Sequence, residues 1–225
     1  MATVSETKPA RTLEPEARFV LRNVGWSGYE ALLQMIGDGH TRVTYDRGDV
    51  ELMSPSRDHE AFAILIGRLI ETVTEELRIP LVALRSTTWR KCLKERGLEA
   101  DNCYYLTSLP RIRGKRGEID LTIDPPPDLA IEIEMTRSAL DRMGVYAGLG
   151  VPEVWRFDGE TLTIERLQDD GSYATIERSV ELPAISRDEV VHWVQQGEEI
   201  DDHTEWGCNL REWVRAEVLP RHQGR

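Results

Sequence analysis

The chain has 225 residues, 40% of them hydrophobic, and a formal net charge of −12 at pH 7. This length and composition suffice for one good-sized core, so we expect a single domain with extensions. Affinity for a nucleic-acid backbone comes largely from Lys and Arg, so the acidic balance argues against a nonspecific nucleic-acid coat. Cys92, Cys103 and Cys208 show no Cys-x-x-Cys spacing, which favours buried thiols over a structural zinc site.

The N-terminal region is polar, and the chain contains no run of about 18 apolar residues. We therefore expect a cytoplasmic protein without membrane contact. Residues 1–18 are predicted to form a disordered leader. Residues 19–225 are predicted to form one domain, with a C-terminal helical extension from about residue 184.

A basic window interrupts the acidic chain between Arg85 and Arg116. It holds nine basic and three acidic residues, so its charge is +6 and the rest of the chain carries −18. Such a window could bind a phosphate-bearing partner, although a solvated charged loop is an equally good interpretation. The window residues predicted to bind nucleic acid are Lys91, Arg111, Arg113, Lys115 and Arg116.

The first elements alternate between helix and strand. Apolar spacing predicts a helix over 27–36, with Ser27 and Glu30 in capping-box register. Strands are predicted over 41–45 and 50–53, joined by a tight turn.

The clearest helical pattern covers 58–77, where apolar residues recur at steps of three and four. His59 and Glu60 lie in its first turn and could support a site. Because the helix dipole favours a carboxylate there, a capping role for Glu60 is at least as plausible, and a histidine more often packs.

Two further strands are predicted over 81–90 and 97–106, the second with Asp101 near its start. Residues 119–123 could form a short strand or an extended approach. The three prolines that follow Asp124 then impose an extended entry to the next strand.

The stretch Asp128 to Glu134 is predicted to form a strand whose acidic side chains all lie on one face. Side chains alternate between the two faces of a strand, so Asp128, Glu132 and Glu134 share one side and three apolar residues share the other. Carboxylates two residues apart repel each other unless a basic group or a cation compensates them. The pattern therefore suggests a cation site.

The C-terminal third continues the alternation. A helix is predicted over 138–149, with Arg142 and Tyr146 one turn apart on a shared face. Strands over 154–157, 161–167 and 173–178 follow, and two small helices close the chain. Ser186 and Glu189 stand in capping-box register for the first of these helices. Trp206 and Trp213 belong to an apolar stripe of the second, and tryptophans at helical spacing are usually core residues. The order predicts an α/β fold in which helices flank a central mixed sheet that carries an added β-hairpin.

These residues suggest metal-assisted chemistry. Asp101 and Glu132, from adjacent strands, could converge on a hard divalent cation such as Mg²⁺. Glu134 could orient or deprotonate a water. Arg142 is the nearest cation in sequence for stabilising charge that develops on a phosphate.

Three stretches resemble the Uma-type restriction endonuclease family of the PD-(D/E)XK nuclease superfamily. They are Gly97 to Leu106, Asp124 to Glu134, and Leu140 to Trp155. The resemblance spans roughly residues 29–178 and includes Met53 to Ser56 followed by His59 and Glu60.

The resemblance implies a restriction-endonuclease-like core and Mg²⁺-dependent DNA cleavage, with Mn²⁺ as a substitute. Asp101 and Glu132 match the motif acids and would be the metal ligands. Glu134 stands where the superfamily has its lysine, and Arg142 on the next helix would supply the basic group. An arginine stays protonated near neutral pH, so stabilisation of the phosphate is its expected role.

Two other interpretations stay open at this point. The fold could be kept as a catalytically inactive module that binds nucleic acid or protein, since the lysine is missing and the chain is acidic. A metal-free hydrolase is more distant, because no Gly-x-Ser-x-Gly motif is present. A homodimer is plausible on superfamily grounds, although no self-complementary surface is evident.

Overall fold

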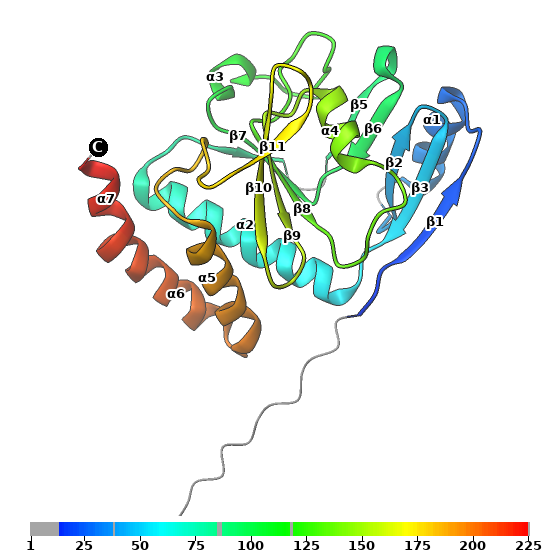
Figure 1. The fold of residues 1–225 in the computed structure, drawn as a ribbon. Coiled ribbons are helices and arrows are strands. Elements are labelled where there is room, and N and C mark those ends of the chain that lie inside the picture. The colour runs from blue at the N-terminus through cyan, green and yellow to red at the C-terminus, as the bar shows by residue number, and fades with distance from the viewer. Residues whose placement is uncertain (1–13, 38, 85–86, 118, 225) are drawn as a thin grey trace, which may run out of the picture.

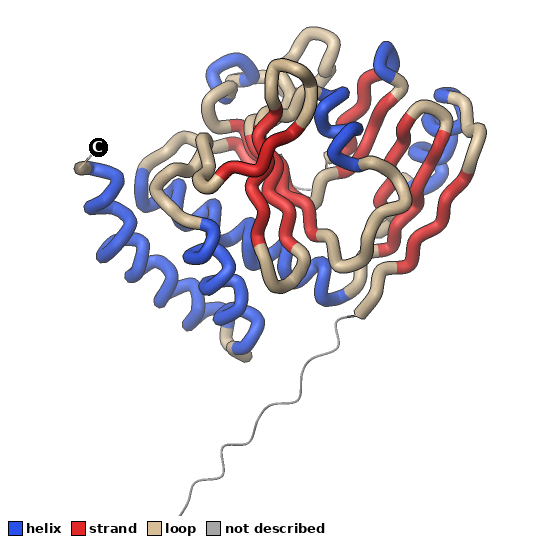
Figure 2. Tube along the Cα trace, in the orientation of Figure 1, coloured by secondary structure: helices blue, strands red, loops and turns tan. Residues whose placement is uncertain are grey.

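The computed structural model describes residues 14–37, 39–84, 87–117 and 119–224. Two β-sheets lie side by side and helices cover them (Figures 1 and 2). The strands are β1 (Ala17–Leu21), β2 (Arg42–Asp46), β3 (Asp49–Ser54), β4 (Val82–Ala83), β5 (Thr88–Lys91), β6 (Arg96–Glu99), β7 (Asn102–Tyr105), β8 (Leu129–Ile133), β9 (Glu153–Phe157), β10 (Leu162–Leu167) and β11 (Tyr173–Ile176). The helices are α1 (Trp26–Ile36), α2 (Arg57–Leu77), α3 (Leu109–Ile112), α4 (Arg142–Leu149), α5 (Arg187–Glu199), α6 (His203–Trp213) and α7 (Leu219–Gln223), with short helical turns at Cys92–Lys94 and Val214–Val218.

The larger sheet is the predicted central mixed sheet. Its six strands run in the order β11-β10-β9-β8-β7-β4. β8 and β9 are parallel and are connected through α4, whereas the other neighbours are antiparallel. β10 and β11 form the predicted hairpin at one edge of the sheet, and the fold class is α/β as expected.

Strand β8 is buried on both faces. Its residues Leu129, Ile131 and Ile133 share an apolar cluster with α2, α5 and α6, while Ala130 belongs to a second cluster with α4. The predicted alternation of the strand is therefore real, but its acidic face is not open to solvent. A buried face obliges every carboxylate on it to find a partner.

Helix α2 carries the predicted amphipathic pattern. Its apolar stripe packs on the central sheet, where Phe62 meets the Phe157 ring edge-to-face with centroids 5.1 Å apart. Ser56 is the N-cap and accepts a hydrogen bond from the His59 backbone nitrogen over 3.2 Å. The cap fixes where the first turn begins and therefore where the His59 side chain lies.

The second sheet is antiparallel, with five strands in the order β1-β3-β2-β6-β5. Helix α1 covers it, and Tyr29 stacks on Tyr45 with ring centroids 4.8 Å apart. The predicted helix over 27–36 is confirmed, but its predicted capping box is wrong. Gly25 is the N-cap and makes no side-chain cap, because Ser27 already lies inside the helix.

Two predicted strands are each divided between the sheets. The stretch 81–90 contributes β4 to the central sheet and β5 to the other, and its residues 85–86 fall outside the described ranges. The stretch 97–106 likewise contains β6 of the small sheet and β7 of the central sheet. The chain crosses between the sheets at Asp101, so this residue lies at their junction.

Two smaller expectations also change. Residues 119–123 form a turn in which Asp120 accepts hydrogen bonds from the backbone and hydroxyl of Thr122, rather than a strand. The helix predicted from Ser138 begins at Arg142, with Asp141 as its N-cap. Residues 138–141 therefore form a loop that leads into α4.

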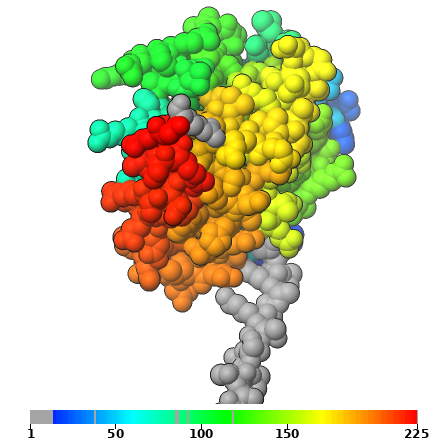
Figure 3. Space-filling model, turned by 60° about the vertical axis from the view of Figure 1, so that its left-hand side comes forward, coloured from blue at the N-terminus to red at the C-terminus, as the bar shows by residue number. Residues whose placement is uncertain are grey.

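The C-terminal helices pack beside α2 and gather on one side of the molecule (Figure 3). The predicted capping box of Ser186 and Glu189 is present at the start of α5. Trp206 of α6 is buried, and its Nε1 donates to the Trp193 carbonyl oxygen over 2.9 Å. The tryptophans at helical spacing are therefore core residues, as the pattern indicated.

Candidate active site

Asp101 and Glu132 lie close together at the junction of the two sheets. The β7–β8 register ends with Asn102 opposite Ile131, and just beyond it the Asp101 backbone nitrogen donates to the Ile131 carbonyl oxygen over 3.2 Å. Asp101 Oδ2 accepts a hydrogen bond from the Ile133 backbone nitrogen over 2.8 Å, and both acids are buried. Asp101 therefore contacts the backbone on both sides of Glu132, and its charge acts on the Glu132 carboxyl. The structure thus brings together the two carboxylates that the sequence pattern paired.

Two cationic side chains hold Asp101. His59 Nε2 donates to Asp101 Oδ1 over 2.8 Å, and Arg42 Nη2 lies 3.5 Å from the same oxygen. His59 Nδ1 is bonded in turn to Glu16, which lies just before β1. Burial by itself would raise the pKa of the Asp101 carboxyl, but His59 and Arg42 lower it overall. Asp101 is therefore ionised at neutral pH.

The His59 ring lies between two carboxylates. Burial would lower its pKa, yet the hydrogen bonds and charges of Asp101 and Glu16 raise it to about 9. The ring is therefore protonated at neutral pH, and both of its nitrogens donate hydrogen bonds. This arrangement makes the predicted supporting residue a fixed cation beside Asp101.

We expect the free energy of unfolding to fall as the pH rises from about 7 through about 9. Folding raises the pKa of His59 from 6.5 to about 9, so its stabilisation is complete below 6.5 and disappears as the folded form loses its proton. Urea unfolding at several pH values, in EDTA, measures the effect. The His59→Gln variant, which cannot titrate, should have a flatter profile, and equal slopes for both proteins would contradict the assignment.

Glu132 is held by residues of α4. Its Oε2 accepts hydrogen bonds from Arg142 Nη2 and from the Tyr146 hydroxyl, each over 2.7 Å. Arg142 Nε lies 2.6 Å from Oε1, but its N–H bond is not aligned, so Oε1 accepts no hydrogen bond among the described residues. Burial raises the pKa of the Glu132 carboxyl, Arg142 opposes this, and the charge of Asp101 adds to it. Arg142 therefore offsets the effect of burial on the pKa of Glu132 only in part.

Arg142 also ties the helix to the small sheet. Its guanidinium donates to the Thr44 hydroxyl of β2 and to the Glu99 carbonyl oxygen at the end of β6, the latter over 3.1 Å. Burial would lower the pKa of Arg142, but Glu132 raises it overall. The side chain stays protonated, so it can orient a carboxylate or meet a phosphate but cannot act as a base.

Glu60 reaches the site only through an arginine. Its Oε1 accepts from Arg42 Nη2 over 3.0 Å, the same nitrogen that faces Asp101. Its side chain is 45% exposed, whereas those of His59 and Asp101 are almost fully buried. Of the two predicted supporting residues, His59 contacts Asp101 directly, whereas Glu60 contacts Arg42, which in turn faces Asp101.

Two buried acids anchor the loop between β8 and α4. Glu51 of β3 accepts hydrogen bonds from the Ser138 hydroxyl over 2.8 Å and from the Ala139 nitrogen over 2.7 Å. Glu16 accepts from the Thr136 nitrogen over 3.2 Å. Residues 14–18 of the predicted leader thus take part in the site, while residues 1–13 lie outside the described ranges.

A cavity of about 400 Å³ opens beside Glu132. Arg142, Met143 and the 137–141 loop form part of its wall. Glu134 and Arg156 complete the lining, and the Glu134 carboxylate accepts a hydrogen bond from Arg156 Nη2. The structure therefore places Glu134 beside Glu132, as predicted, but with a cation of its own from β9.

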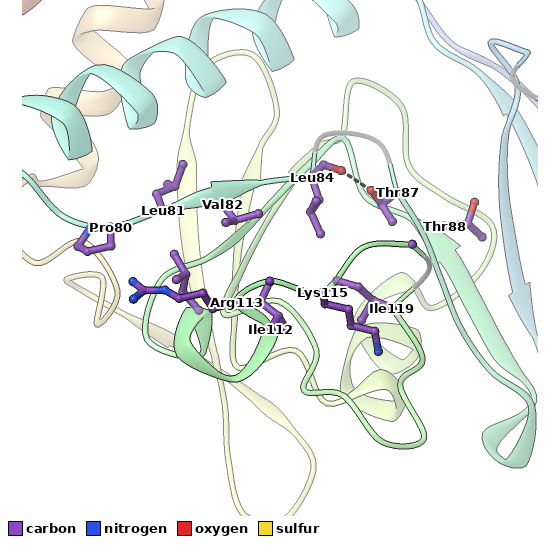
Figure 4. A pocket seen from close by; sticks show the side chains of 13 residues that line it. Pro80, Leu81, Val82, Leu84, Thr87, Thr88, Ile112, Arg113, Lys115 and Ile119 are labelled. Carbon is purple, nitrogen blue, oxygen red and sulfur yellow. Dashed lines mark hydrogen bonds between the residues drawn. The ribbon is translucent and has the colours of Figure 1, made fainter.

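The residues predicted to bind nucleic acid lie on separate elements. Lys91 ends β5, Arg111 belongs to α3, and Arg113, Lys115 and Arg116 follow α3. Arg113 and Lys115 line an apolar cavity of about 630 Å³ next to the β4 segment, where Ile112 and Arg113 face Leu81 and Val82 (Figure 4). Lys115 is paired with Asp124. None of these five residues lines the cavity beside Glu132.

The sequence patterns did not predict several residues of the candidate site. Glu16, Arg42, Thr44 and Glu51 come from the small sheet or the segment before it, and no motif or spacing connects them to Asp101. Tyr146 did carry a signal, because it lies one helical turn after Arg142.

Asp101 and Glu132 are the residues that could hold a divalent cation. Both side chains offer only oxygen atoms, and Glu132 Oε1 accepts no hydrogen bond from the described residues. Mg²⁺ often binds through one or two carboxylates with water completing its shell, so the pair fits such an ion. Within the described ranges, no group of three or more His, Cys, Asp and Glu side chains could hold a metal.

No helix among the described residues is long and apolar enough to cross a membrane. A cytoplasmic location and a homodimer stay predictions.

Comparison with curated proteins finds no match. Among solved structures, the chain is similar to a protein from Anabaena variabilis described as a "putative nuclease belonging to DUF820", with 19% identity, a TM-score of 0.49, and coverage of 68% of this chain and 90% of that one. It is also similar to the type IIG restriction endonuclease BpuSI, with 10% identity, a TM-score of 0.36, and coverage of 76% of this chain and 18% of that one. The model of the Uma2 family, described as "Putative restriction endonuclease", matches residues 27–198. Because this match covers most of the chain, the protein belongs to the Uma2 family.

Proposed function

We propose that this protein is a Mg²⁺-dependent DNA endonuclease that hydrolyses phosphodiester bonds, with Mn²⁺ as a substitute ion. The observation that carries the proposal is the pair of buried carboxylates, Asp101 and Glu132, held close together beside the Arg142 guanidinium. The family description supports the substrate class. Two acids and a fixed cation are the groups that metal-assisted phosphodiester hydrolysis requires.

Asp101 and Glu132 would hold the ion. Mg²⁺ bound there would supply Lewis-acid stabilisation of the negative charge that develops on the phosphate. His59 keeps Asp101 ionised and directs its Oδ1, and Glu16 holds the His59 ring in place. Both acids are thereby pre-oriented, which reduces the entropy lost on binding.

Arg142 orients Glu132 through its Nη2 nitrogen and is itself locked by Thr44 and the Glu99 carbonyl. The Tyr146 hydroxyl provides a second donor to the same carboxylate oxygen. Since Arg142 stays protonated, its contribution is positive charge and geometry rather than proton removal.

Contacts to the DNA backbone are assigned to Lys91, Arg111, Arg113, Lys115 and Arg116. Each cation that meets a phosphate adds sequence-independent affinity that falls with salt. The net charge of −12 on the whole chain would oppose loose association, so binding should depend on these few positions.

Conversion of supercoiled plasmid to open-circular or linear DNA tests the proposed function. We expect conversion in Mg²⁺ and in Mn²⁺ and none in EDTA. Absence of product in both metals, from protein that shows a cooperative thermal unfolding transition, would overturn the proposal.

A binding module without cleavage is the second candidate. His59, Arg42 and Arg142 already face the two carboxylates, so the site is held together without a metal. This candidate requires DNA retention without cleavage in both metals, weakened by Arg111→Ala or Lys115→Ala. Cleavage that depends on Asp101 would exclude it.

A further inference from the structure

A second acid–base pair, Glu134 and Arg156, borders the cavity beside Glu132. The parallel β8–β9 register sets Arg156 next to Glu132, and Glu134 follows the last residue of β8. The two side chains are joined by a hydrogen bond and remain 22% and 34% exposed, respectively. Unlike the buried pair of Glu132 and Arg142, this one can be reached from solvent.

A third arginine lines the same cavity. Arg137 lies in the loop between β8 and α4 and is exposed, and it forms no ion pair with any residue that the structure describes. Besides Glu134, Arg156 has Glu132 beside it in the β8–β9 register and Glu165 of β10, whose Oε1 lies 3.9 Å from Arg156 Nη1. Two guanidinium groups that solvent can reach therefore line the cavity beside Glu132, one of the two candidate metal ligands.

The two acid–base pairs differ in how readily they release their arginine. Removing the partner of a buried ion pair leaves an unpaired charge in a poorly solvated place and is strongly unfavourable. An ion pair exposed to the extent of Glu134–Arg156 is screened by water and contributes little. Arg156, and not Arg142, is therefore the arginine that can exchange its carboxylate for another anion.

We propose that Arg156 and Arg137 bind a phosphodiester group of the DNA strand beside the candidate active site, and that the Glu134 carboxylate occupies Arg156 until DNA replaces it. This inference rests on the proposed function for the identity of the ligand. Guanidinium groups bind carboxylate and phosphate oxygens with the same donor geometry, so one anion can stand in for the other. Glu134 then has a use at the position where the superfamily has a lysine: it is a removable counter-ion.

The Glu134→Gln variant tests the exchange. It keeps the side-chain shape, removes the competing charge and should tighten binding of a short fluorescein-labelled DNA duplex by roughly three- to fivefold. Fluorescence anisotropy in EDTA measures this without cleavage. The dependence of affinity on salt should also steepen by about one phosphate contact.

The Glu165→Gln variant is the matched control. It removes the same charge from a neighbour of Arg156 that does not line the cavity, so we expect a smaller gain. In an Arg156→Gln background, Glu134→Gln should give almost no gain. An equal gain in both backgrounds would mean a general electrostatic effect and would overturn the inference.

The result is separable from the test of cleavage. Metal-dependent nicking without any gain from Glu134→Gln would overturn the phosphate subsite and leave the endonuclease proposal intact. A gain that requires Arg156, in protein that never nicks DNA, would support the subsite and overturn the cleavage proposal.

Discussion

Replacing Asp101 with asparagine should lower metal-dependent plasmid nicking by at least about 100-fold. Residues that merely orient metal ligands change metal affinity or activity by about 10- to 100-fold, so a ligand should matter at least as much. Asparagine keeps the shape of the side chain and removes the negative charge that faces His59 and Arg42. We expect the same loss for Glu132→Gln, because both acids are needed for one ion.

Two further measurements connect the loss to the site. Binding of Mn²⁺, followed by its effect on water proton relaxation, should weaken in both variants. Glu177→Gln is the matched control, since Glu177 is 89% exposed and pairs with Arg187 outside the site. Nicking that survives in Asp101→Asn or Glu132→Gln would remove these residues from the proposed mechanism.

Replacing Arg142 with alanine should lower the free energy of unfolding by about 3–5 kcal/mol. The change leaves Glu132 buried without its cation, and loss of one partner of a buried ion pair costs about this much. It also removes donors to Thr44 and to the Glu99 carbonyl oxygen. Urea unfolding in EDTA measures the difference, because no metal can then replace the lost charge.

Metal addition provides the control for this prediction. A divalent cation between Asp101 and Glu132 would compensate part of the missing charge, so Mg²⁺ should raise the Tm of Arg142→Ala more than that of the wild-type protein. Arg142→Lys keeps a positive charge and should recover part of the stability. A change below about 1 kcal/mol in Arg142→Ala would contradict a buried pair, since only exposed pairs contribute so little.

Local patterns predicted the elements that bury one continuous apolar face. The stripe of α2, the alternation of β8 and the capping box of α5 are all properties of neighbouring residues, and the structure confirms them. Local patterns did not predict the points at which the chain passes from one sheet to the other. No local signal separates β6 from β7, because only two residues lie between them and the sheets that they join are set by distant pairing partners.

The candidate site likewise contains residues that local patterns predicted and residues that they did not. Asp101 and Glu132 were paired from two motifs on expected neighbouring strands, and the β7–β8 pairing brings them close together. Arg142 and Tyr146 were signalled by helical spacing, and both bond to Glu132. Arg42, Glu16 and Thr44 had no signal, since they reach the site through packing of the small sheet against the central one.

Periodicity and motifs were enough to predict the α/β class, the long helix that packs on the sheet, the acidic strand and the two carboxylates of the candidate site. These features depend on residues close together in the chain. The partners of the acids come from distant elements and could not be predicted in this way: His59 and Arg42 on Asp101, Arg142 on Glu132, and Arg156 on Glu134. Charge compensation of a buried acid depends on which distant side chains share its low-dielectric surroundings, and folding alone sets that.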